Sequence, residues 1–175
     1  MVHKELSSDM KMFVEHLYTK GYLKNANFMP QDKFDASCFE ISYAREFLKF
    51  AASKFGKDHP DIAGWLSAGN LKKVALFGCP SLGQRTVYAA KHMRKFFKID
   101  EHKVCQTCSL KELCMLRNKS FAKNPTKLDL ADVIRVLIMY SMESVPQKLV
   151  VPEEIKTSVS RLLKEVISLS QETMT

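Results

Sequence analysis

The sequence predicts an all-α protein. Apolar residues recur with the spacing of helices almost throughout, and no segment shows the alternation of a β-strand. The 175 residues include only six Gly and six Pro and contain no low-complexity tract, which favours ordered structure. We therefore expect a single helical domain over residues 1–175, with about seven helices.

The first helix is expected to start near residue 8. Ser8 or Asp9 is a suitable N-cap, because a short polar side chain can accept a hydrogen bond from the first helical turn. Gly21 is expected to end the helix. The residues expected to face inward are Met12, Phe13 and Leu17.

The second helix follows a polar linker. Asp35 or Ser37 is expected to open it, and it should run through Lys54, with Gly56 just beyond its end. An aromatic side is expected from Phe39, Tyr43, Phe47 and Phe50. A short helix that carries Trp65 and a short apolar segment over 71–77 should come next.

The fourth segment is amphipathic. Ser81 is expected to cap a helix from Leu82 to about Lys98. Its apolar stripe consists of Val87, Ala90, Met93 and Phe97. Its other side is basic, and Tyr88 is the candidate for an exposed ring that stacks on a base.

Two more helices complete the predicted fold. Thr126 or Asp129 should open a strongly apolar helix that runs to about Val145, and its few polar residues predict a central position in the core. Pro152 suits the first position of the last helix, and the acidic residues that follow it suit the positive helix end.

Four of the five cysteines follow the pattern C-x25-C-x2-C-x5-C. They are Cys79, Cys105, Cys108 and Cys114. Four thiolates complete the ligand set of a 4Fe–4S cluster, which requires soft sulfur ligands. We expect such a cluster to join the corner at Cys79 to the later cysteine loop and so to staple the domain. A capping box at Ser109 and Glu112 predicts a short helix that would carry Cys114 back to the same centre.

A zinc ion is the first alternative to the 4Fe–4S cluster. Zinc sites with four cysteines usually contain two C-x2-C pairs, whereas this sequence has one, and His102 is a possible zinc ligand. Unliganded thiols or a disulfide are the other alternative. Cys38 has no partner at a useful spacing and is expected to be an ordinary buried thiol on a helix.

The net charge of +8 arises in the segment that contains these cysteines. Residues 72–127 carry thirteen basic and three acidic side chains, whereas residues 1–71 are neutral and residues 128–175 have a net charge of −2. Such a block indicates a polyanion partner, with an acidic protein or a ribosome-like assembly, or simply a solvated surface, as alternatives. The residues expected to contact nucleic acid are Arg85, Lys91, Arg94, Lys95, Lys98, Lys103, Lys119 and Lys123.

The run from Cys105 to Cys114 resembles the cluster loop of endonuclease-III-type DNA glycosylases. The remote first cysteine is more similar to the cluster of RecB-type and CRISPR-associated nucleases. The resemblance covers about ten residues, and it implies a structural 4Fe–4S cluster beside bound nucleic acid.

The catalytic residues of these families have no clear counterpart. The segment from Pro80 to Thr86 is similar to the helix–hairpin–helix signature of the glycosylases, but the position of their lysine falls on Arg85, which cannot form a Schiff base. Asp100 lies beside the cysteine loop, where their aspartate is not expected. The E-x-K run at Glu154 lies in a predicted helix instead of a strand. We therefore predict no catalytic residue.

The sequence thus predicts a non-catalytic iron–sulfur protein that binds nucleic acid, with RNA slightly favoured over DNA, in RNA processing or on the ribosome. A divergent nuclease or DNA glycosylase, an electron-transfer protein and a zinc-binding structural subunit are the alternatives. The odd number of cysteines and a start unlike a signal peptide predict a reducing intracellular compartment, either an organelle matrix or the nucleus or cytoplasm. No apolar run approaches the roughly 18 residues of a membrane span, so we expect no membrane partner.

Overall fold

The computed structural model describes residues 5–30, 33–117, 119, 125–142, 145–146 and 148–173. The predicted all-α class is confirmed, because these residues form helices and contain no β-strand. In chain order the elements are α1 (Ser8–Thr19), the 3-10 helix η1 (Ala36–Glu40), α2 (Ser42–Asp58), the 3-10 helix η2 (Pro60–Trp65), α3 (Ala68–Phe77), α4 (Gln84–Phe96), α5 (Glu101–Thr107), α6 (Leu130–Ser141) and α7 (Glu153–Thr173).

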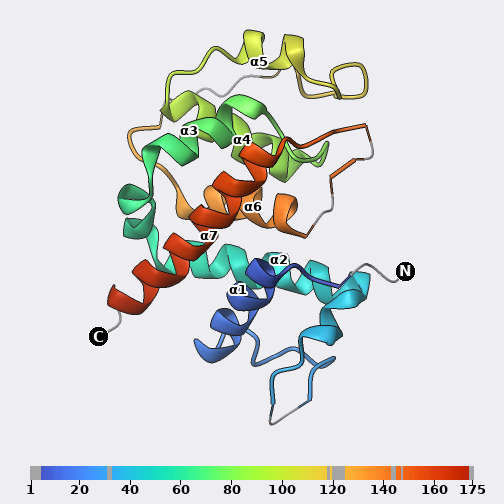
Figure 1. Ribbon diagram of the computed structural model, residues 1–175, viewed down its shortest axis with the longest axis vertical. Coiled ribbons are helices and arrows are strands. Elements are labelled where there is room, and N and C mark those ends of the chain that lie inside the picture. Colours follow the sequence, from blue (N-terminus) through green and yellow to red (C-terminus); the bar gives the residue numbers. More distant parts are fainter. Residues whose placement is uncertain are drawn as a thin grey trace.

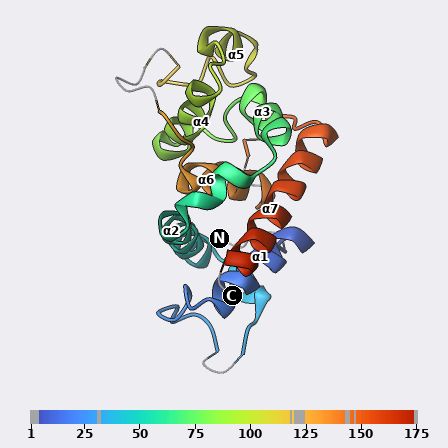
Figure 2. The same ribbon diagram turned by 90° about the vertical axis from the view of Figure 1, so that its left-hand side faces the viewer.

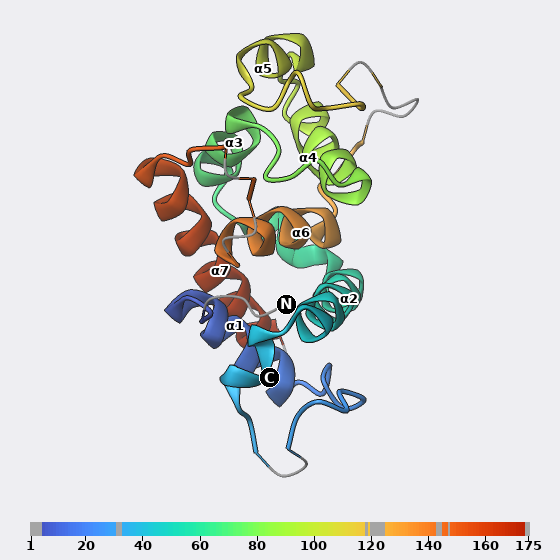
Figure 3. The same cartoon turned by 90° about the vertical axis from the view of Figure 1, so that its right-hand side faces the viewer.

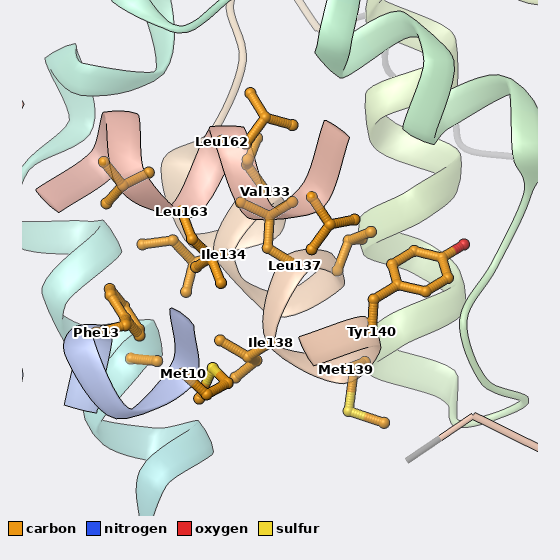
Figure 4. Packing of buried hydrophobic residues seen from close by; sticks show 14 of the residues in the cluster. Met10, Phe13, Val133, Ile134, Leu137, Ile138, Met139, Tyr140, Leu162 and Leu163 are labelled. Atoms are coloured by element: carbon orange, nitrogen blue, oxygen red, sulfur yellow. The ribbon is translucent and has the colours of Figure 1, made fainter. Parts of the chain in front are cut away.

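Helix α6 is the central element of the core, as its apolar sequence predicted. Asp129 caps it by accepting a hydrogen bond from the backbone N–H of Ala131 at 2.9 Å. It contacts α2, α4 and α7, and α7 also contacts α1 and α3 (Figure 1). Close to the centre, Ile134 and Ile138 of α6 lie between Leu163 of α7 and Met10 of α1 (Figure 4).

The predicted starts of the N-terminal helices need correction. Ser7, not Ser8 or Asp9, caps α1, because its hydroxyl accepts a hydrogen bond from the backbone N–H of Met10. Asp35 opens only the short η1. Ile41 has an extended backbone conformation, so α2 is a separate helix that begins at Ser42.

The predicted aromatic side of the second helix is also partly wrong. Phe39 is fully buried, but Tyr43 and Phe50 are 59% and 64% exposed. Small residues form the buried side of α2 instead, and Gly56 lies within the helix near its end. Short side chains there allow α2 and α6 to approach closely.

The cysteine-rich segment lies at one end of the molecule. Helix α5 and the turns after it cover the ends of α3 and α4, on the side away from α1 (Figures 1 and 2). Cys38, in η1, is half-buried and belongs to another part of the fold. Within the described residues no helix has both the length and the apolar character needed to cross a membrane.

His16 predicts how stability depends on pH. Burial lowers the pKa of its imidazole from 6.5 to about 4, helped by the charges of Lys20 and His59, and its Nε2 lies 3.0 Å from the Ser170 hydroxyl. The unfolded chain therefore binds more protons between these two pH values. We expect about 3 kcal/mol of stability, fully present above pH 6.5, to be lost as the pH falls towards 4.

Denaturant unfolding at a series of pH values would measure this loss. The variant His16→Gln should flatten the dependence between pH 6.5 and 4, whereas His102→Gln, on an exposed position of α5, should leave it as in the wild type. The same steep loss in His16→Gln would show that another group is responsible.

Candidate metal centre

All four clustered cysteines line one cavity between α4 and α5. Cys79 lies in the segment between α3 and α4, Cys105 in the last turn of α5, Cys108 at the C-cap of α5, and Cys114 in the turns beyond. The cavity holds about 410 Å³ of empty space, part of it continuous with solvent. The fold thus brings together side chains that are up to 35 positions apart in the sequence.

The structure does not assemble a metal ligand set. Among the described residues, no three or more Cys, His, Asp or Glu side chains are arranged to hold a metal ion. The cluster and its staple therefore stay predictions. What the residues offer is the chemistry of the donor set, four thiol groups around one cavity.

The backbone explains why Cys79 reaches the cavity. Gly78 ends α3 with a φ of +130°, a conformation that other residues rarely adopt, and a Cβ atom added there would lie 3.8 Å from the side chain of Val104 in α5. Pro80 follows and is buried. The chain therefore turns sharply at Cys79.

The predicted capping box is wrong. Residues 109–113 form turns, and the helix in this region is α5, which ends before Cys108. Asp100 caps α5 by accepting a hydrogen bond from the backbone N–H of His102 at 3.0 Å. The next predicted helix also starts later, at Gln84, with Gly83 instead of Ser81 as its N-cap.

Two N–H donors point at sulfur atoms. The backbone N–H of Leu110 donates to Cys108 Sγ at 3.4 Å, and Arg94 Nη2 donates to Cys79 Sγ at the same distance. The thiol of Cys105, in contrast, donates to the carbonyl oxygen of Arg117 at 3.7 Å. Hydrogen bonds to ligand sulfurs are part of the outer shell of protein-bound clusters, where they orient the ligands and tune the metal.

Arg94 is fully buried in the wall of the cavity. Its guanidinium makes two hydrogen bonds with the carboxylate of Glu101, from Nε at 2.5 Å and from Nη2 at 3.2 Å. Its Nη1 is buried and has no hydrogen-bond partner among the described residues. A charged donor left unsatisfied in this way is costly, and a negatively charged group in the cavity would satisfy it.

Lys91 of α4 is a second buried cation in the wall of this cavity. It is 2% exposed, and its Nζ donates to the carbonyl oxygens of Leu116 and Lys119, both at 2.5 Å. The ammonium therefore holds the end of the cysteine loop against α4. The prediction that Lys91 and Arg94 contact nucleic acid is wrong, because both side chains are turned inward beneath this loop.

Burial opposes ionisation of two of the four thiols, Cys79 and Cys105. Burial raises the pKa of Cys79, although the adjacent Arg94 opposes the effect. Burial, followed by the charge of Glu101, also raises the pKa of Cys105, against the opposing charges of Arg94 and Lys91. A bound metal would have to displace the thiol protons, so loading would release protons.

The other predicted nucleic-acid contacts that the structure describes lie on the surface. Arg85, Lys98, Lys103 and Lys119 are exposed, and Lys95 is partly exposed. Lys98 follows the C-cap of α4, Phe97, and has a φ of +57°. Lys123 lies outside the described residues.

Comparison of the chain with protein-family models, with curated protein sequences and with solved structures gives no significant match. The resemblance of the cysteine spacing to iron–sulfur enzymes therefore stays a prediction.

Sequence reasoning missed Glu101, the partner of Arg94. One signal was available, because Glu101 is one of only three acidic residues in the basic segment 72–127, and it precedes Cys105 by one helical turn.

Proposed function

We propose that the protein holds a 4Fe–4S cluster on Cys79, Cys105, Cys108 and Cys114 and presents the basic surface around it to nucleic acid. The observation that carries the proposal is the shared cavity, which four thiols line together with the buried Arg94. The cluster would supply four bonds that tie the Cys79 corner to the cysteine loop. The basic residues around it would bind the nucleic acid.

Charge supports this assignment. Four thiolates bring four negative charges into a partly buried site, and such charges need compensation. Arg94 and Lys91 provide two positive charges in the cavity wall, and Arg94 still has an unsatisfied donor. Measured iron and zinc contents of anaerobically prepared protein would decide between the cluster and zinc, and zinc alone at one equivalent would exclude the cluster.

The proposal that the protein binds nucleic acid rests on its exposed lysines. Lys95, Lys98 and Lys103 lie at the end of α4 and the start of α5, the two helices that contribute residues to the cysteine cavity. Lysines so placed favour phosphate contacts without base specificity. We keep the slight preference for RNA over DNA.

Replacing Lys95, Lys98 and Lys103 together by glutamine should weaken RNA binding while the iron content stays unchanged. Each lost phosphate contact should flatten the slope of log affinity against log salt by about 0.7, so the triple variant should lose about 2 units of slope. Filter binding across a salt series would measure both quantities.

The matched control replaces three exposed lysines elsewhere, Lys24, Lys156 and Lys164, by glutamine. It has the same net charge as the triple variant and should bind more like the wild type. Equal losses in both variants would show that only net charge matters. Absence of binding by the iron-loaded wild-type protein would contradict the proposed function.

A further inference from the structure

A second basic surface lies away from the metal centre, in a large groove between α2 and α4. The groove contains about 1680 Å³ of empty space, including the part that is open to solvent. Helix α6 contacts both α2 and α4 and lies between them (Figure 3). Residues of its first turns also line the groove.

Helix periodicity builds both walls. On α2 the lining residues include Phe50, Lys54 and Lys57, which are spaced by four and three positions and share one face. On α4 they include Arg85 and Tyr88, which are three positions apart. Each wall therefore carries both an aromatic ring and at least one cation.

The groove has an excess of positive charge. Five Lys or Arg residues line it against three acidic residues. Each acid already has a partner: Glu46 pairs with Lys49 at 2.8 Å, Asp132 with His92 at 2.6 Å, and Asp129 caps α6. The cations on the rim, Lys54, Lys57 and Arg85, are exposed. An anionic ligand would therefore meet a positive rim.

Aromatic rings lie among these cations. Phe50 is 64% exposed, an unusual position for a large apolar side chain, and the guanidinium carbon of Arg85 lies 5.9 Å from the centre of its ring. Tyr88 is half-buried in the opposite wall. Rings between cations are the arrangement by which proteins bind unpaired nucleotides, because each ring stacks on a base while the cations contact phosphates.

We infer that this groove binds single-stranded nucleic acid, with bases stacked on Phe50 and Tyr88 and phosphates on Lys54, Lys57 and Arg85. The inference rests on the proposed function and states where on the protein the nucleic acid binds. A duplex fits less well, because its bases are stacked on each other and cannot reach the rings. Phe50, Lys54 and Lys57 lie in the first 71 residues, where the net charge is zero, so charge counting along the sequence does not reveal them.

The test uses the iron-loaded full chain and three labelled probes: a single-stranded RNA of mixed sequence, the same sequence as DNA, and the corresponding duplex. Phe50→Ala should weaken binding of both single strands by about tenfold and change duplex binding little. Lys54→Gln with Lys57→Gln should flatten the salt slope by about 1.4. The controls are Trp65→Ala, an exposed ring outside the groove, and Lys24→Gln with Lys164→Gln.

Different outcomes identify which idea fails. If the groove variants bind as the wild type does while the Lys95, Lys98 and Lys103 variant loses affinity, the groove inference is overturned and the proposed function stands. If the wild-type protein binds none of the probes, both are overturned. Equal weakening on the duplex and on single strands would contradict the stacking on Phe50. The ratio of the affinities for the RNA and DNA probes shows whether the groove prefers ribose or deoxyribose.

Discussion

If Cys108 is a ligand of the proposed cluster, replacing it by serine should remove the iron and lower the midpoint of thermal unfolding by about 10 °C. Cys108 lines the cavity together with the other three cysteines, and its sulfur accepts a hydrogen bond from the backbone N–H of Leu110. A crosslink that closes a loop of this length contributes about 3 kcal/mol, which corresponds to roughly 10 °C in a domain of this size.

The loss should be local as well as global. Without ligand bonds, the hydrogen bonds of Lys91 and Arg94 and the buried side chains of Val104 and Leu110 would hold this segment, and Arg94 would keep an unsatisfied donor. Hydrogen exchange should therefore accelerate in α5 and the following turns but not in α6, the central core helix. Serine at Cys79, Cys105 or Cys114 should have the same effect.

Cys38→Ser is the matched control, since Cys38 lies in η1 and does not line the cavity. It should keep its iron and its unfolding midpoint. Iron bound at the wild-type level in Cys108→Ser, or lost in Cys38→Ser, would refute the assignment. Unchanged stability of the iron-free protein would show that the cluster is not a staple.

Local sequence signals predicted the helices well where propensity and packing agree. The apolar pattern of residues 130–141 and the cap at Asp129 are both realised in α6. The break between η1 and α2 was missed, because helical spacing continues across Ile41 although its backbone is extended. A periodic pattern alone cannot show such an interruption.

The basic face of α4 shows how far the candidate site could be predicted from the sequence. Lys91, Arg94, Lys95 and Lys98 have the spacing of a solvated helix face. The loop from α5 onward folds over part of that face, so two of these side chains are buried and bind carbonyl oxygens or a carboxylate instead. Which surface of a helix a distant loop covers is a tertiary property, and the same holds for the groove formed by α2 and α4.

The contact between α2 and α6 gives the second large effect. A Cβ atom added at Gly56 would lie 2.6 Å from Cα and 2.7 Å from the backbone nitrogen of Ala131. Both neighbours are backbone atoms of the central helix, so a rotamer change cannot relieve the overlap and one helix must move. Gly56→Ala should therefore reduce the free energy of unfolding by about 3 kcal/mol, as measured by denaturant unfolding.

Gly69→Ala is the matched control, because Gly69 lies in α3 and a Cβ there meets nothing within 4 Å. The same chemical change should stabilise the protein slightly, by up to about 1 kcal/mol, through helix propensity. Equal stability of Gly56→Ala and the wild type would contradict the close approach. Since Ala131 also lines the groove, a shift of α2 would move Lys54 and Lys57, so the folded fraction of Gly56→Ala should bind single strands more weakly than Gly69→Ala does.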